Sequence, residues 1–116
     1  MRHRNVNKIL DRKAGPRKAL VRGLVEALII YEKIQTTNAR AEVIRPIVEK
    51  LVTIGKANDL TARRRLLDYL YTNNGVKKVL EVLSPRYAQR AGGYLRINKI
   101  GPRQGDAAEM VLISFV

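Results

Sequence analysis

The side chains that could support catalysis or bind a metal are too few and too scattered to form an active site. His3 is the single histidine, and the chain has no cysteine, so thiolate chemistry and disulfides are excluded. The aspartates are dispersed, and the neighbouring acids Asp106 and Glu109 have no second acidic pair to hold a magnesium ion with them. The sequence therefore predicts a protein that is not an enzyme, has no cofactor and acts on no small-molecule substrate.

The basic side chains are the informative ones, and they are concentrated in two zones. The chain has 23 Lys and Arg against 10 Asp and Glu, for a net charge of +13. Residues 1–22 contain eight basic residues and one acid, and residues 84–105 contain five basic residues and no acid. Such an excess opposes compaction unless a polyanion neutralises it. We therefore expect a nucleic-acid-binding protein.

The candidate contact residues come from these two zones. The first zone includes His3, which lies between two arginines and is better suited to a phosphate or base-edge contact than to a metal site. An alternative for the whole N-terminal segment is a solvated tail without a role. The candidate RNA-binding residues are Arg2, His3, Arg4, Lys8, Arg12, Lys13, Arg17, Lys18, Arg22, Arg86, Arg90, Gly92, Gly93, Tyr94, Arg96, Lys99 and Arg103.

Three features have two interpretations each. Gly92-Gly93 either allows close approach of an RNA backbone or forms a plain turn. Tyr87 and Tyr94 either stack on unpaired bases or pack in the core. The consecutive basic residues 63–65 point in different directions around a helix, so they form either an RNA contact or a solvated helix face.

Apolar residues at a spacing of three and four predict four helices in the body of the chain. The first runs from Pro16 to about Lys33, and the second begins at Asn38 as its cap and ends near Gly55. A third helix is capped by Asp59 or Thr61. A fourth, short helix runs through residues 76–83.

Three short segments should interrupt the helical pattern. Pro46 should kink the second helix or restart it. The sequence Asn73-Asn74-Gly75 predicts a turn, and Ser84-Pro85 should end the fourth helix.

The C-terminal part of the chain predicts strands. Residues 94–100 and 110–116 are expected to pair as an antiparallel hairpin, and residues 34–37 can add a third strand. Helices followed by strands indicate an α+β fold, with a helical body of about four helices packed against a small, mostly antiparallel sheet. We expect a basic, extended N-terminal arm over residues 1–15 and a single domain over residues 16–116. No segment is apolar enough to span a membrane, and the basic N-terminus is not a signal peptide.

Four segments, in this order and spacing, resemble one known family. They are Met1-Arg2-His3-Arg4, Ile34-Gln35-Thr36-Thr37, the stretch RAGGYLRI at residues 90–97, and Gly105-Asp106 with Met110. Together they resemble the bacterial large-subunit ribosomal protein seventeen family over the whole chain, and RAGGYLRI followed by GPRQGD is the most specific part.

This resemblance implies a cytoplasmic, ribosome-bound structural protein of the large subunit. It implies that the chain binds large-subunit rRNA near the peptide exit tunnel, beside neighbouring ribosomal proteins, and supports the folded RNA without catalysis. The RNA-facing positions would be Arg2, His3 and Arg4, together with Arg90, Gly92, Gly93, Tyr94 and Arg96.

Two other classes of function remain as alternatives. A DNA-binding architectural or helix-turn-helix regulatory protein would need a helix with one basic face, and only the run of arginines at residues 63–65 approaches this. A peripheral membrane module would need a basic amphipathic helix free to lie on lipid, whereas the apolar stripes here also have to supply the core.

Overall fold

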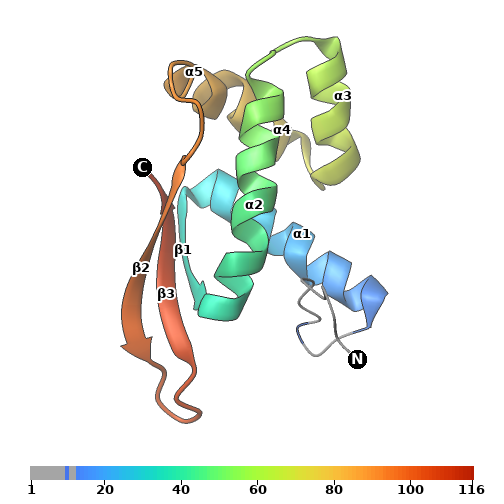
Figure 1. Cartoon of the computed structure of the whole chain (residues 1–116). Helices are drawn as coiled ribbons and strands as arrows, with labels where there is room; N and C mark the ends of the chain where they lie inside the picture. Colours follow the sequence, from blue (N-terminus) through green and yellow to red (C-terminus); the bar gives the residue numbers. More distant parts are fainter. Residues whose placement is uncertain (1–9, 11–12) are drawn as a thin grey trace, which may run out of the picture.

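The computed structural model describes residue 10 and residues 13–116, which form a helical body beside one small sheet (Figure 1). In chain order the elements are α1 (Ala14–Tyr31), β1 (Lys33–Thr37), α2 (Asn38–Gly55), α3 (Leu60–Tyr69), α4 (Asn73–Lys78), the π-helical turn η1 (Val79–Leu83), α5 (Ser84–Arg86), β2 (Leu95–Pro102) and β3 (Glu109–Phe115). Because α4, η1 and α5 follow one another without a break, the described residues contain four helical stretches. The expected α+β class is confirmed.

The sheet is antiparallel, with β3 between the other two strands in the order β1-β3-β2. The hairpin of β2 and β3 is as predicted, and β1 is the third strand. Ile34 of β1 and Ile97 of β2 both lie opposite Ile113 of β3. A bulge between Lys99 and Gly101 falls where the apolar alternation of the sequence fails.

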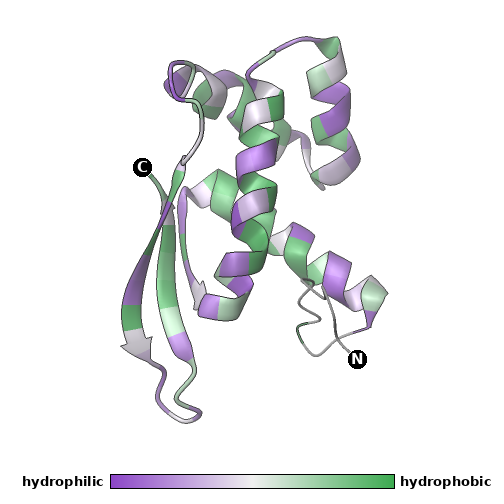
Figure 2. Ribbon diagram, in the orientation of Figure 1, coloured by the Kyte–Doolittle hydropathy of each residue, from purple (hydrophilic) through white to green (hydrophobic). Residues whose placement is uncertain are grey.

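The core lies between the helices and one face of the sheet. Figure 1 shows the helices on one side of the sheet, and Figure 2 shows hydrophobic residues concentrated on β3 and on the parts of α1 and α2 that meet. The fully buried aliphatic residues of these three elements are Val25, Leu28, Ile29, Ala41, Ile44, Val48, Val52, Val111 and Ile113. The predicted apolar stripes therefore form the core.

The cap of α2 differs from the prediction by one residue. The hydroxyl of Thr37 accepts a hydrogen bond from the backbone N–H of Arg40 at 3.4 Å, whereas the Asn38 side chain donates to Glu42. Thr37 is therefore the cap, because it still has extended backbone while Asn38 is already helical. At α3 the cap is Asp59, which accepts from the N–H of Ala62 at 2.8 Å.

The turn predicted at Asn73-Asn74-Gly75 is wrong, because these residues begin α4. Thr72 caps this helix by accepting from the N–H of Gly75. The carboxylate of Glu26 on α1 in turn accepts from the backbone N–H of Thr72 at 2.9 Å and from its hydroxyl. A contact between residues 46 positions apart thus selects a helix start over the local turn preference.

Both internal prolines lie within continuous helical stretches: α2 does not restart at Pro46, and the predicted helix end at Ser84-Pro85 is wrong. Pro46 lies on the exposed side of α2, and the fully buried Ile44 and Val48 hold the helix to the core on either side of it. Pro85 directly follows the π-helical turn η1, whose last bond runs from the N–H of Ser84 to the carbonyl of Val79. The helical stretch therefore continues past Ser84 to Arg86.

Candidate nucleic-acid interface

The first basic zone is only partly described. Arg2, His3, Arg4, Lys8 and Arg12 lie outside the described residues. Of the remaining members, Lys13 and Lys18 are exposed at the start of α1 and Arg17 is half-buried there. None of these three forms an ion pair with another described residue, so their positive charges are available to a polyanion.

Arg22 has a different role from the other members of the first zone. Its guanidinium donates to the backbone carbonyls of Tyr69 at 2.7 Å and Asp68 at 3.0 Å, and it lies over the rings of Tyr69 and Tyr71. These carbonyls lie at the C-terminal end of α3, where a cation is favoured by the helix dipole. Burial also raises the pKa of the Tyr69 hydroxyl. Arg22 thus joins α1 to α3.

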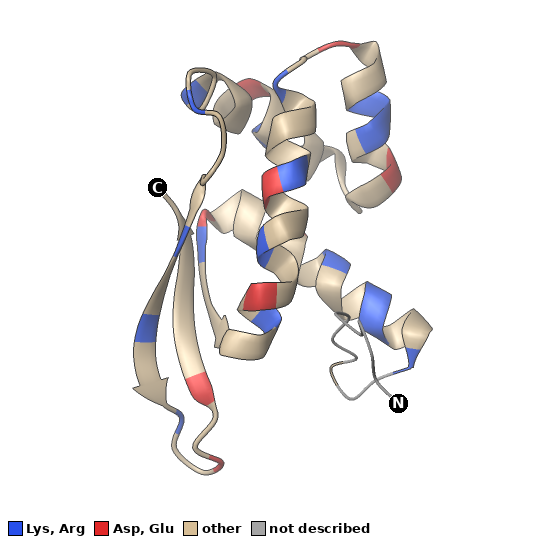
Figure 3. Ribbon diagram, in the orientation of Figure 1, with Lys and Arg blue, Asp and Glu red and all other residues tan. Residues whose placement is uncertain are grey.

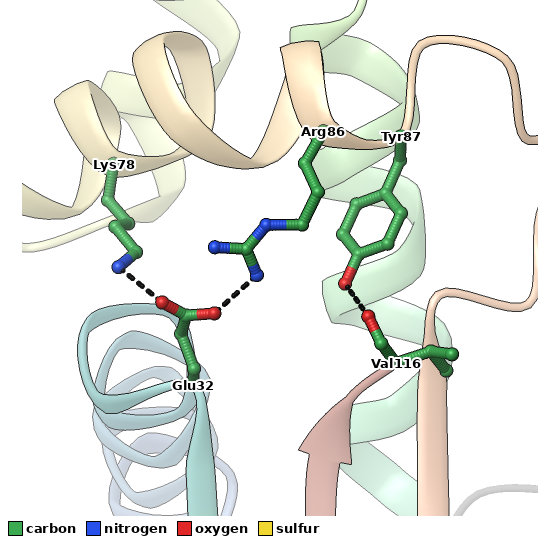
Figure 4. A network of polar contacts seen from close by, with 5 residues as sticks. All are labelled: Glu32, Lys78, Arg86, Tyr87 and Val116. Carbon is green, nitrogen blue, oxygen red and sulfur yellow. Dashed lines mark hydrogen bonds and ion pairs between the residues drawn. The ribbon is translucent and has the colours of Figure 1, made fainter.

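Arg86 is also used within the protein. It forms an ion pair with Glu32, whose other carboxylate oxygen lies 2.8 Å from the ammonium of Lys78 (Figure 4). The hydrogen bonds from Arg86 and Lys78 lower the pKa of Glu32 from 4.5 to about 2. Glu32 has a left-handed backbone, with φ 66°, which is uncommon for a residue other than glycine.

The loop that follows α5 is held by α2. The ammonium of Lys56 donates a hydrogen bond to the backbone carbonyl of Arg90 and lies 4.8 Å from the centre of the Tyr94 ring. The Tyr94 hydroxyl is 3.3 Å from that of Thr53. Burial raises the pKa of Tyr94, but Lys56 and Thr53 more than offset this and lower it overall.

The two tyrosines of the second zone are core residues. Tyr94 is fully buried and Tyr87 is 4% exposed, and their ring centres are 5.1 Å apart. The hydroxyl of Tyr87 donates to the carbonyl of Val116 at 2.7 Å (Figure 4). Of the two interpretations of these rings, the structure supports core packing. The placement of Tyr94 among side chains that face RNA is corrected accordingly.

The two glycines of the loop have different reasons to be glycine. Gly93 has φ +65°, so the turn itself favours glycine there. At Gly92 the φ is ordinary and no atom lies within 4 Å of where a Cβ would be. The fold therefore makes no demand for glycine at Gly92, which is consistent with close approach of a ligand.

The basic residues of the hairpin fall into two groups. Arg103 pairs with Asp106 through two hydrogen bonds of 3.1 and 2.6 Å, and Arg103 lowers the pKa of Asp106 to about 2. Lys99 lies 3.4 Å from Glu109. Arg96 is exposed on β2, as Arg90 is in the preceding loop, and neither forms an ion pair within the described part of the chain.

The structure thus places the candidate residues in separate regions and does not bring them together in one site. Figure 3 shows the basic residues of α1 and those of β2 on separate parts of the molecule. Sequence reasoning missed Lys56, because its contact with Arg90 spans 34 positions and no local pattern reveals it. It also missed Lys33, an exposed cation at the start of β1, because that residue lies outside the two basic zones.

Metal-binding and membrane-spanning features are not found in the described residues. No three His, Asp or Glu side chains are grouped closely enough there to hold a metal ion. Nor does that part of the chain contain a helix of the length and apolar character needed to cross a membrane.

Fold and surface together define a small, strongly basic α+β protein. The family model described as Ribosomal protein L17 matches residues 20–116, and the chain belongs to this family. A relative named large ribosomal subunit protein bL17, from Desulforamulus reducens, is 52% identical over 88% of this chain and 91% of its own length. A protein of the same name from Dehalococcoides mccartyi is 47% identical over the whole chain and 99% of its own length. The expected family is confirmed.

Proposed function

We propose that this chain is a structural constituent of the large ribosomal subunit and binds large-subunit rRNA. The family and the names of the relatives support the assignment to the large subunit. The observation that carries the RNA contact is a set of exposed cations without acidic partners among the described residues: Lys13, Lys18, Arg90 and Arg96. Such groups gain affinity by releasing counterions from phosphates.

Among the described candidates, the proposed contact residues are those whose side chains make no ion pair with another described residue and are not buried in the core. Lys13, Arg17 and Lys18 continue the arm, with its own candidates Arg2, His3, Arg4, Lys8 and Arg12. Arg90, Gly92, Gly93 and Arg96 form the second contact. Arg22, Arg86, Lys99 and Arg103 also make contacts within the protein, so their contribution to RNA binding is smaller.

The finer parts of the proposal concern location and neighbours. The chain would lie on the exit-tunnel side of the subunit, beside other large-subunit proteins, as a non-catalytic component of cytoplasmic ribosomes. These parts rest on the family resemblance, while the charge distribution supports the RNA contact itself.

The first test is sedimentation of a cell lysate through a gradient containing moderate salt, with this protein quantified in each fraction by mass spectrometry. We expect one copy per large subunit, retained as the salt is raised. Recovery at the top of the gradient, or with chromosomal DNA, would contradict the proposal and favour the DNA-binding alternative.

A further inference from the structure

One face of the sheet is not covered by the helices, and its composition is unusual. The residues of β3 alternate between the two faces, so Val111 and Ile113 are buried against the helices while Leu112 and Ser114 are half-buried on the other face. Figure 1 shows the helices on one side only. We call the opposite side, over β1, β3 and β2, the open face.

The strand register places polar and basic side chains in rows across the open face. In one row Lys33 and Arg96 lie on either side of Ser114, and in the next row Gln35 and Asn98 lie on either side of Leu112. The four flanking side chains are exposed. None of them forms a hydrogen bond or an ion pair with another described residue.

The charge of these two rows has one sign. Neither row contains an acid. Glu32, beside Lys33, turns to Lys78 and Arg86 on the helical side, and Glu109 at the start of β3 lies 3.4 Å from Lys99. Neighbouring strands are about 4.8 Å apart, so the backbones of Lys33 and Arg96 are separated by roughly 10 Å, two strand spacings. Two long cationic side chains can therefore reach phosphates on both sides of a shallow groove.

The functional groups of the two rows indicate the kind of partner that the open face can bind. Two cations suit phosphate oxygens, and two amides with a hydroxyl suit the 2′-hydroxyl groups and base edges of a minor groove. The two rows contain no aromatic ring on which an unpaired base could stack. We propose that the open face binds the sugar–phosphate backbone of double-stranded rRNA, an inference that rests on the proposed function and adds Lys33, Gln35 and Asn98 to its contacts.

The test compares binding of the full-length protein and its variants to large-subunit rRNA over a series of salt concentrations. For Lys33→Gln with Arg96→Gln we expect binding about tenfold weaker near 0.15 M salt, and a slope of log K against log salt that is flatter by about 1.4–1.8. For Gln35→Ala with Asn98→Ala we expect weaker binding and an unchanged slope, because no phosphate charge is released. All four side chains are exposed, so thermal unfolding should match that of the wild type.

The control variant removes two exposed cations from the helices, Arg45→Gln with Lys77→Gln, for the same change in net charge. Its affinity should stay within about twofold of the wild type. Equal losses for this variant and for Lys33→Gln with Arg96→Gln would overturn the inference, because charge and not position would then matter. An unchanged rRNA affinity of the Lys33→Gln, Arg96→Gln variant, in a preparation whose wild type binds rRNA tightly, would also overturn the inference.

Two further outcomes separate this inference from the proposed function. If the Lys33→Gln, Arg96→Gln variant binds free rRNA normally but fails to sediment with large subunits, the open face contacts a protein and the inference is wrong. If the wild type itself shows no preference for rRNA over duplex DNA, the proposed function fails first.

Discussion

The ion pair between Glu32 and Arg86 joins residues 54 positions apart and holds the end of α1 to α5. Lys78 adds a second cation to the same carboxylate, and the backbone carbonyl of Glu32 accepts from the N–H of Phe115 at 3.0 Å. One residue thus connects α1, β3 and the last helical stretch. The left-handed backbone of Glu32 ends α1, with its N–H bonded to the carbonyl of Leu28 at 2.8 Å.

We expect Glu32→Gln to lower the free energy of unfolding by about 1–2 kcal/mol near neutral pH, a value reduced for the partial exposure of this carboxylate. Since the pKa of Glu32 falls from 4.5 to about 2 on folding, its contribution is complete above pH 4.5 and disappears as the pH falls through 2. Urea unfolding of both proteins at pH 7, 4 and 2 should show the difference shrinking. Glu81→Gln, an exposed acid in η1, is the control. A difference that is independent of pH would contradict the role of the ion pair.

Gly55 is predicted to be intolerant of any side chain. A Cβ at this position would lie 2.6 Å from both the hydroxyl oxygen of Ser84 and a methyl group of Val79, so these two side chains or their helical stretch would have to shift. We expect Gly55→Ala to lower the free energy of unfolding by about 1–3 kcal/mol. Gly23→Ala, in α1 with no atom within 4 Å, should raise it by about 0.5–1 kcal/mol through helix propensity. Thermal unfolding of the two variants compares the cost of a steric clash at Gly55 with the gain in helix propensity at Gly23. Equal effects on stability would disprove the close contact at Gly55.

Lys56 is predicted to order the loop that contains Arg90 without contacting RNA itself. Lys56→Met keeps the stem but removes the hydrogen bond to the Arg90 carbonyl, so amide hydrogen exchange over residues 90–93 should accelerate. Affinity for rRNA should fall severalfold while the slope of log K against log salt stays the same, because no phosphate contact is lost. For Arg90→Gln the slope itself should flatten by about 0.7–0.9. A change in slope for Lys56→Met would make Lys56 a direct contact.

Arg22 and Lys18 have the same charge and lie one turn apart on α1, yet they should behave in opposite ways. Arg22→Gln removes a guanidinium from two backbone carbonyls and two tyrosine rings, and we expect a loss of about 1–3 kcal/mol in unfolding free energy. Lys18→Gln should change stability by less than about 0.5 kcal/mol but flatten the salt dependence of rRNA binding. Measuring both quantities for both variants checks the assignment, and a reversed pattern would refute it.

Features that depend on residues close together in the sequence could be predicted, and features that depend on distant residues could not. Apolar spacing is local, so the stripes of α1 and α2 and the strands of the hairpin were all predictable. The start of α4 was not, because Glu26 selects it from 46 positions away against a local turn preference. The same limit applies to the site: composition located the two basic zones, but only tertiary contacts show that Arg22 and Arg86 are engaged within the protein. The row of Lys33 and Arg96 depends on strand order, which a hairpin alone does not define.

The arm should supply a large share of the electrostatic affinity for rRNA. Deleting it would also remove Leu10, which packs against the core, so stability and binding would change together. We therefore propose to replace Arg2, Arg4, Lys8, Arg12 and Lys13 by Gln and to leave Leu10 in place. If all five contact phosphates, the slope of log K against log salt should flatten by roughly 3.5–4.5 units, with unfolding unchanged. A slope equal to that of the wild type would show that the arm is a solvated tail, and the second basic zone and the open face would then have to account for the binding.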